Sequence, residues 1–379
     1  INTISEAQHK YAMTEFDMII CDEAHRTTGA THSNEDDSNF VKIHDADFIL
    51  GKKRLYMTAT PRIFSDDVKD DAKEYTLYSM DNEDLFGQVL YTINFSEAVN
   101  LGLLVDYKVI VLAVDSDTIV QKIGNVITEH NEIVVDDAAR IVGCWKALSK
   151  QGIHADVAGD TDPMKRALAF CQVIDPSDKA RKHQVSSRRI SNIFQTVVEA
   201  YQKAEAAEGN EISHKLICEA QHVDGSMGAD KKEQKLNWLK SNPDKKYDEN
   251  NVERPICRIL TNVRCLSEGV DVPALDAVLF LTPRNSQVDV VQSVGRVMRT
   301  VKNPVTQEHL KKKGYVILPV VIPPGVEAHK ALDDNKTYKV VWQVLNALRS
   351  HDDSFDAMIN RMDLTGVDKS KMEVIAITD

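Results

Sequence analysis

Short apolar runs alternate with longer stretches of helical periodicity along most of the chain. The apolar runs predict buried strands at residues 16–21, 54–57, 108–114, 168–171, 215–219, 257–261, 277–281 and 315–321. Apolar residues at helical spacing predict helices at residues 136–150, 191–207, 287–299 and 338–348. Strands that alternate with helices are typical of parallel sheets, so the pattern predicts an α/β fold. Pro323, Pro324 and Gly325 end this pattern.

Composition narrows the class of protein. The 379 residues are enough for two domains, and 42% hydrophobic with 27% charged residues is ordinary for a globular protein. The net charge of −12 means that any contact with nucleic acid must use local basic patches. The six cysteines form no close pairs, which favours a reducing cytoplasmic location over a disulfide framework. The longest apolar run, residues 315–324, is too short to cross a bilayer, so we expect no membrane association.

Two acidic residues follow the first predicted strand. Asp22 and Glu23 come directly after residues 16–21, and His25 lies two positions further on. Carboxylates at the carboxyl end of a strand face the crevice in which α/β sheets bind ligands. In a nucleotide-driven motor, one carboxylate can hold Mg²⁺ and the next can act as general base toward water. The alternative is an ordinary pair of surface acids.

Two hydroxyl residues follow the next predicted strand. Thr58 and Thr60 come after residues 54–57, and Pro61 prevents a helix from continuing there. Each hydroxyl can bond a neighbouring carboxylate or the loop that carries His25. Taken alone, the tripeptide is more typical of a strand-end turn.

Two further groups lie in the second half of the chain. Thr261 ends a predicted strand, and Gly269 and Asp271 follow in a loop whose glycine allows a phosphate or sugar to approach the backbone. Later, Gln292, Arg296 and Arg299 have the spacing of one helix face, with valines at 288, 291 and 294 predicted opposite and Gly295 predicted to pack closely. Arginines on such a face can neutralise a transferring phosphoryl group, and the alternative is a solvated basic face.

In this order, the four groups resemble motifs II, III, V and VI of superfamily 2 helicases. Residues 167–171 and 218–236 resemble motif IV and the segment that follows it. The resemblance covers roughly residues 16–321. It implies two tandem RecA-like domains with parallel sheets, ATP in the cleft between them, and nucleic acid across both.

The resemblance also implies roles for individual residues. Asp22 and Glu23 carry the magnesium and general-base roles, and Thr58 and Thr60 belong to the nucleotide site. His25 and Gln292 look like the pair that links the ATP state across the cleft. Arg296 and Arg299 look like finger arginines. Gly269 and Asp271 look like the motif that touches nucleotide and strand together, and Thr261 is assigned to nucleic acid.

The particular residues of the motifs indicate a narrower family within the superfamily. The last motif reads GRVMR, where RNA helicases of the DEAH class usually read GRAGR. Together with EGVDVPALD, residues 136–148 and the GADKKEQKLNWLK stretch, this is similar to the motors of single-polypeptide (type ISP) restriction-modification enzymes, which translocate on duplex DNA. In that family, a nuclease precedes the motor, and methyltransferase and target-recognition domains follow it. We therefore expect nuclease and methyltransferase domains outside these residues.

One departure from the family concerns the phosphate-binding loop. No G-x-x-x-x-G-K-[ST] sequence occurs here, although that loop cradles the nucleotide phosphates. We therefore expect residues 1–100 to be the second half of the first RecA-like domain, which is truncated at its N-terminal half. Residues 101–324 would be the second domain, and 325–379 a partly helical tail that leads to a further domain. Residues 1–379 alone should have negligible ATPase activity.

A basic cluster is the candidate contact with DNA. Residues 179–189 carry five Lys or Arg and no acid, and end in Arg188 and Arg189. Such clusters bind phosphates without reading sequence, although a solvated face is an equal alternative. Three functions stay open: an ATP-driven translocase motor on duplex DNA, a strand-separating RNA or DNA helicase, or a non-catalytic module that binds nucleic acid.

Overall fold

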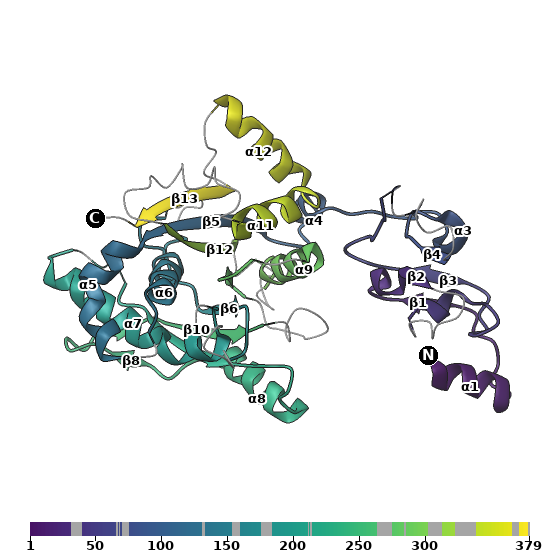
Figure 1. Cartoon of the computed structure of the whole chain (residues 1–379), viewed down its shortest axis with the longest axis horizontal. Coiled ribbons are helices and arrows are strands. Elements are labelled where there is room, and N and C mark those ends of the chain that lie inside the picture. Colours follow the sequence, from purple (N-terminus) through teal and green to yellow (C-terminus); the bar gives the residue numbers. More distant parts are fainter. Residues whose placement is uncertain are drawn as a thin grey trace. The chain divides into compact units, whose positions relative to one another are not determined.

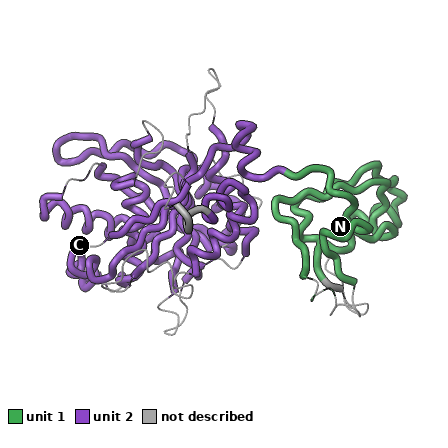
Figure 2. The backbone as a smooth tube through the Cα atoms, turned by 90° about the horizontal axis from the view of Figure 1, so that it is seen from above, with its two compact units in different colours: residues 1–92 green, residues 93–379 purple. Residues whose placement is uncertain are grey.

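The computed structural model divides the chain into two compact units, Ile1–Thr92 and Ile93–Asp379, which Figure 2 shows in green and purple. The structure describes residues 1–31, 40–65, 67, 69, 76–130, 133–153, 160–175, 184–210, 212, 214–263, 275–283, 286–301, 313–322, 339–365 and 371–377.

The first unit is built on two small sheets. Strands β1 (Ile19–Cys21) and β3 (Arg54–Tyr56) pair in parallel, and β2 (Gly29–Thr31) pairs antiparallel with β4 (Thr76–Tyr78). The register places Cys21 beside Tyr56, so the segments that follow β1 and β3 leave the sheet at the same edge. The helical elements are α1 (Asn2–Lys10), η1 (Ala24–Thr27), η2 (Val41–His44) and α3 (Glu83–Phe86).

The second unit contains a seven-stranded sheet in the order β13-β5-β12-β11-β6-β10-β7. Figure 1 labels β13, β5, β12, β6 and β10 of this sheet. All its neighbouring strands pair in parallel. The strands are β5 (Asp106–Asp115), β6 (Arg166–Phe170), β7 (Ile217–His222), β10 (Ile256–Asn262), β11 (Ala277–Phe280), β12 (Lys313–Ile322) and β13 (Met372–Ile377).

Helices cover both faces of this sheet and bury an apolar core on each. One core lies under α5 (Ser116–Glu129), α6 (Val135–Leu148) and α7 (Ser187–Ala207). The other lies under α4 (Phe95–Asn100), α8 (Ala229–Lys240), α9 (Gln287–Val297), α11 (Lys339–Arg349) and α12 (Asp353–Thr365). A short hairpin, β8 (Lys246–Tyr247) and β9 (Glu253–Arg254), follows α8. Strands enclosed on both faces need apolar side chains throughout, which explains the continuous apolar runs.

The predicted α/β class and parallel sheet are confirmed, although several elements differ from the prediction. The helix predicted at 287–299 ends at Val297. Helix α5 was not predicted; its N-cap Asp115 accepts a hydrogen bond from the backbone N–H of Asp117 at 2.8 Å. The α/β pattern does not end at Pro323, because β13 adds a strand beside β5. Among the described residues, no helix is long and apolar enough to span a membrane.

Candidate functional site

The two adjacent carboxylates lie in a tight turn directly after β1. Glu23 adopts a left-handed backbone conformation with φ of 51°, which is uncommon for a residue other than glycine. Its backbone N–H donates to Oδ1 of Asp22 at 2.9 Å, and this bond supports the turn. The turn leaves Asp22 exposed and Glu23 half-buried. The two neighbouring carboxylates therefore have different surroundings.

His25 joins this turn to the segment after β3. Its Nδ1 lies 3.0 Å from Oγ1 of Thr58 and 3.4 Å from Oε2 of Glu23. Thr58 Oγ1 also accepts the backbone N–H of Thr60 at 3.1 Å. Burial lowers the pKa of His25 below its ordinary 6.5, although the Glu23 carboxylate opposes the shift. The predicted bond between the threonine segment and the loop of His25 is thus present, and His25 is neutral at pH 7.

The oxygen atoms at this edge fit a magnesium–nucleotide complex. Asp22 is exposed, and Oγ1 of Thr60 is buried without a hydrogen-bond partner among the described residues. No group of three or more His, Cys, Asp or Glu in the described ranges could hold a metal alone. Magnesium usually binds one or two carboxylates together with substrate phosphates, which is the arrangement that these side chains permit.

In the second unit, the predicted glutamine–arginine face is only partly helical. Gln292 and Arg296 lie on α9, whereas Arg299 follows the helix and forms an isolated antiparallel bridge with Leu104. Arg296 is 6% exposed, and Arg299 is exposed. The single-face expectation is therefore wrong for Arg299. Close packing at Gly295 is wrong too, because a Cβ there would meet nothing within 4 Å.

The predicted nucleic-acid residues have unequal environments. Gly269 and Asp271 lie outside the described residues, as do residues 179–183 of the basic cluster. Thr261 is fully buried, and its hydroxyl donates to the backbone oxygen of Ser187 at 2.7 Å. Arg189 forms an internal ion pair with Asp137, in which Nη2 of the arginine lies 2.6 Å from Oδ2 of the carboxylate. This ion pair is called the clamp below. Arg188, with a side chain 49% exposed, is available to a ligand.

Three buried polar residues that the motifs do not predict lie beneath Arg188. Ser187, His222 and Asp224 form a continuous hydrogen-bonded chain at the carboxyl end of β7. The only sequence signal was that His222 and Asp224 lie in the segment resembling the one that follows motif IV. Their link to Ser187 spans 35 positions in the sequence and is a product of the fold.

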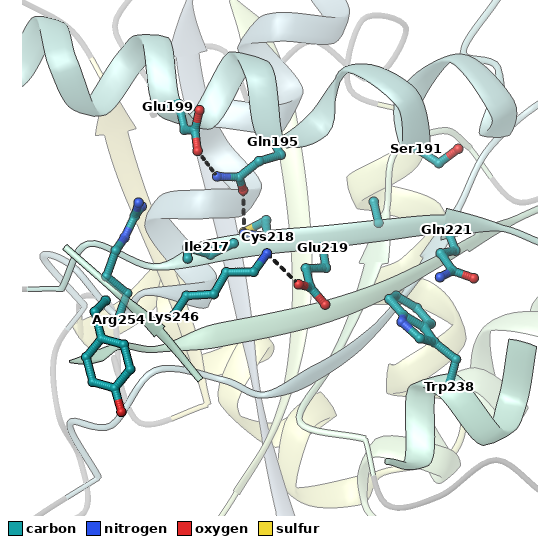
Figure 3. Close-up of a pocket in the computed structure, with 12 residues that line it drawn as sticks. Ser191, Gln195, Glu199, Ile217, Cys218, Glu219, Gln221, Trp238, Lys246 and Arg254 are labelled. Atoms are coloured by element: carbon teal, nitrogen blue, oxygen red, sulfur yellow. Dashed lines mark hydrogen bonds and ion pairs between the residues drawn. The ribbon is translucent and has the colours of Figure 1, made fainter. Parts of the chain in front are cut away.

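A separate pocket of about 560 Å³, called the groove below, is lined by residues of β7, α7, α8 and the β8–β9 hairpin (Figure 3). Gln195 of α7 accepts the backbone N–H of Cys218 at 2.7 Å, where a neighbouring strand would otherwise bond. Lys246 reaches across to Glu219 at 2.7 Å. None of the predicted site residues lines this groove. We interpret this groove as a sheet edge at which side chains take the place of a neighbouring strand, rather than as the candidate site.

Comparison with known proteins gives two family matches in the order expected for a helicase motor. Residues 1–63 match the type III restriction enzyme res subunit, and residues 178–301 match the helicase conserved C-terminal domain. The type I restriction enzyme EcoAI endonuclease subunit of Escherichia coli is 24% identical over 180 residues, which are 45% of this chain and 20% of the relative.

Two solved structures are more similar. The type ISP restriction-modification enzyme LlaBIII bound to DNA is 38% identical with a TM-score of 0.72, over 100% of this chain and 23% of that one. The type ISP enzyme LlaGI, as a nuclease-deletion mutant with a DNA substrate mimic, is 32% identical with a TM-score of 0.53, over 99% of this chain and 20% of that one.

The fold and the two matched regions, for the type III restriction enzyme res subunit and the helicase conserved C-terminal domain, make the chain similar to proteins of the helicase-motor class. Within that class, its similarity is to the motors of the type ISP restriction-modification enzymes. The chain spans between 20% and 43% of the length of the curated relatives it matches.

Proposed function

We propose that this chain is part of an ATP-dependent DNA translocase, in which ATP hydrolysis drives movement along duplex DNA. The observation that carries the proposal is the joining of Asp22, Glu23, His25 and Thr58 at one edge of the β1–β3 sheet. Carboxylates at the end of a parallel strand, linked through a histidine to a hydroxyl segment after the next strand, suit a hydrolytic nucleotide site.

The two carboxylates take different roles because their surroundings differ. Asp22, which is exposed, would hold the Mg²⁺ that accompanies ATP and would thereby help to neutralise the phosphate charge. Glu23, half-buried beside His25, would take the proton of the attacking water. Thr58 keeps His25 in place, and the buried hydroxyl of Thr60 is available to the nucleotide complex.

The second unit would supply positive charge to the same reaction. Gln292, Arg296 and Arg299 would act on the nucleotide, and the arginines would neutralise charge on the transferring phosphoryl group. The Gly269 and Asp271 loop would touch nucleotide and DNA. This assignment rests on motif order and on the family matches.

Duplex DNA is the proposed track, and restriction-modification the proposed context. Both similar type ISP structures are described with DNA or a DNA mimic. Arg188, exposed at the start of α7, would contact the phosphate backbone. Nuclease and methyltransferase domains are expected elsewhere in the same polypeptide. A strand-separating helicase is the second candidate, favoured by the match to the helicase conserved C-terminal domain.

Substitution of Glu23 by Gln in the intact enzyme tests the hydrolytic site. An amide cannot take the proton of water, so Glu23→Gln should bind Mg·ATP with wild-type affinity and lose steady-state hydrolysis and translocation. Asp22→Asn is the contrasting variant and should weaken Mg·ATP binding itself. Nucleotide affinity and ATPase rate are measured for both variants. Wild-type turnover by Glu23→Gln would remove the proposed base, and a non-catalytic binding module would then be the better description.

A further inference from the structure

Hydrogen bonds hold the first turn of α7 against the carboxyl ends of β10 and β7. The hydroxyl of Thr261, on β10, donates to the backbone oxygen of Ser187 at 2.7 Å. Ser187 Oγ lies 3.0 Å from Nδ1 of His222, the last residue of β7. Both links are buried, so the start of this 21-residue helix is held at a fixed place on the sheet.

The hydrogen-bonded chain continues from His222 to Asp224. His222 Nε2 lies 2.9 Å from Oδ2 of Asp224, and a carboxylate can only accept, so Nε2 carries the proton. Serine, histidine and aspartate are also the residues of a hydrolytic triad. Here Ser187 is 0% exposed, and no substrate can reach its hydroxyl. The three residues therefore form a scaffold.

The end of this scaffold is a rigidly held carboxylate. Oδ1 of Asp224 accepts the backbone N–H of Ser226 at 2.8 Å and its hydroxyl at 2.5 Å, while Oδ2 accepts from His222. These bonds, led by that from Ser226, lower the pKa of Asp224 to about 2. Asp224 is 3% exposed and stays ionised throughout the physiological range.

Arg188 brings this assembly to the surface, because its side chain is 49% exposed. Its Nη2 lies 3.6 Å from Oδ2 of Asp224, and its Nη1 lies 3.2 Å from Oδ2 of Asp175, which follows β6. A guanidinium has five N–H donors in one plane, so contacts with two carboxylates leave donors for a further anion. The three groups together carry one net negative charge, so the assembly does not attract phosphate by charge alone.

We propose that Asp224, held by His222 and Ser187, is a positioning residue that orients the Arg188 guanidinium toward a phosphate of the DNA backbone. An exposed arginine must lose side-chain freedom when it binds, and a fixed carboxylate reduces that loss beforehand. The inference rests on the proposed function, because it requires Arg188 to contact DNA. The buried residues would then affect DNA affinity by fixing the orientation of the Arg188 guanidinium.

Equilibrium binding of duplex DNA by the intact enzyme, titrated at several salt concentrations, tests this proposal. Arg188→Ala should weaken binding and reduce the salt slope by about 0.9, the loss of one phosphate contact. Asp224→Asn keeps the packing but removes the carboxylate. It should weaken binding roughly 2- to 12-fold, the equilibrium equivalent of ordering one long side chain, while the salt slope stays unchanged.

A double-mutant cycle separates positioning from a general structural role. Asp224→Asn should have no further effect in an Arg188→Ala background, and little in an Arg188→Lys background, since an ammonium needs no planar orientation. Asp244→Asn, an exposed carboxylate in the loop after α8, is the matched charge control. Thermal midpoints of all variants confirm that each is folded.

Two results would overturn the inference in distinguishable ways. If Arg188→Ala changes neither affinity nor salt slope, the proposed DNA contact of Arg188 fails and the inference falls with it. If Arg188→Ala acts as expected but Asp224→Asn weakens binding equally in its background, or strengthens binding, Asp224 does not position the arginine. In that case the proposed DNA contact stands.

Discussion

At the scale of single residues, small differences in surroundings separate neighbouring side chains of the same type. Asp22 and Glu23 are adjacent, but only Glu23 has a left-handed backbone and a histidine within 3.4 Å. Sequence spacing predicted that both carboxylates follow a strand, because strand ends are marked by the loss of apolar residues. It could not predict the conformation of Glu23, since the turn depends on bonds to residues 33 or more positions away.

Two histidines of the first unit also owe their properties to the fold. His44 donates from Nε2 to the backbone oxygen of Thr27 at 3.0 Å, and its Nδ1 lies 3.0 Å from the hydroxyl of Tyr56. Burial lowers the pKa of His44, as it lowers that of His25. Both neutral rings support η1, the segment that follows the two carboxylates.

Acidification should therefore loosen the first unit. A histidine with a lowered pKa in the folded state binds fewer protons than it does when unfolded. Its contribution to stability is present above the ordinary pKa of 6.5 and is lost as the pH falls below it. Amide hydrogen exchange of residues 24–28 and 41–45, normalised for intrinsic rates, should be faster at pH 5.5 than at pH 7.5. His44→Gln should show a smaller change, and equal protection at both pH values would contradict the argument.

At the scale of elements, the sequence predicts strands better than it predicts the contacts between helices. The apolar runs of β5, β10 and β12 can be recognised as strands in the sequence, because both faces of these strands are buried. Arg189 illustrates the limit: its place at the end of a basic cluster suggests DNA binding. The fold instead directs it inward against Asp137, which is 1% exposed and joins α6 to α7. Sequence pattern contains no information about a partner 52 positions away.

Loss of this clamp should destabilise the second unit. Arg189→Ala leaves the buried Asp137 carboxylate without its close partner, which typically costs about 3–5 kcal/mol of unfolding free energy. Arg188→Ala, one position earlier and exposed, should change stability by less than about 0.5 kcal/mol. All three tryptophans lie in the second unit, so denaturant unfolding of this chain followed by tryptophan fluorescence reports on it. Equal midpoints for the two variants would show that the clamp is not stabilising.

At the scale of the whole molecule, the order of the motifs determines which chemistry belongs to which unit. The carboxylates, His25 and the threonines lie in the first unit, and the arginines lie in the second. The sequence supplied that assignment because each group follows its own strand or lies on its own helix. Motif order alone does not show that these groups act in one reaction. A role of the second unit in ATP hydrolysis is therefore tested by measuring ATPase activity.

Arg299 is the residue that tests cooperation between the units most cleanly. Arg296 is 6% exposed, so its removal would disturb the packing of α9, whereas Arg299 is exposed beyond the helix. In the intact enzyme, Arg299→Ala should keep nucleotide and DNA affinity but lose roughly 10³-fold or more in ATP turnover, because a finger arginine stabilises charge that develops only in the transition state. Arg299→Lys should recover part of the rate, since it restores charge without the planar fork. Steady-state ATPase is measured beside nucleotide affinity for both variants. Wild-type turnover by Arg299→Ala would assign the side chain to the structure at the end of α9 or to DNA, and would remove Arg299 from the reaction.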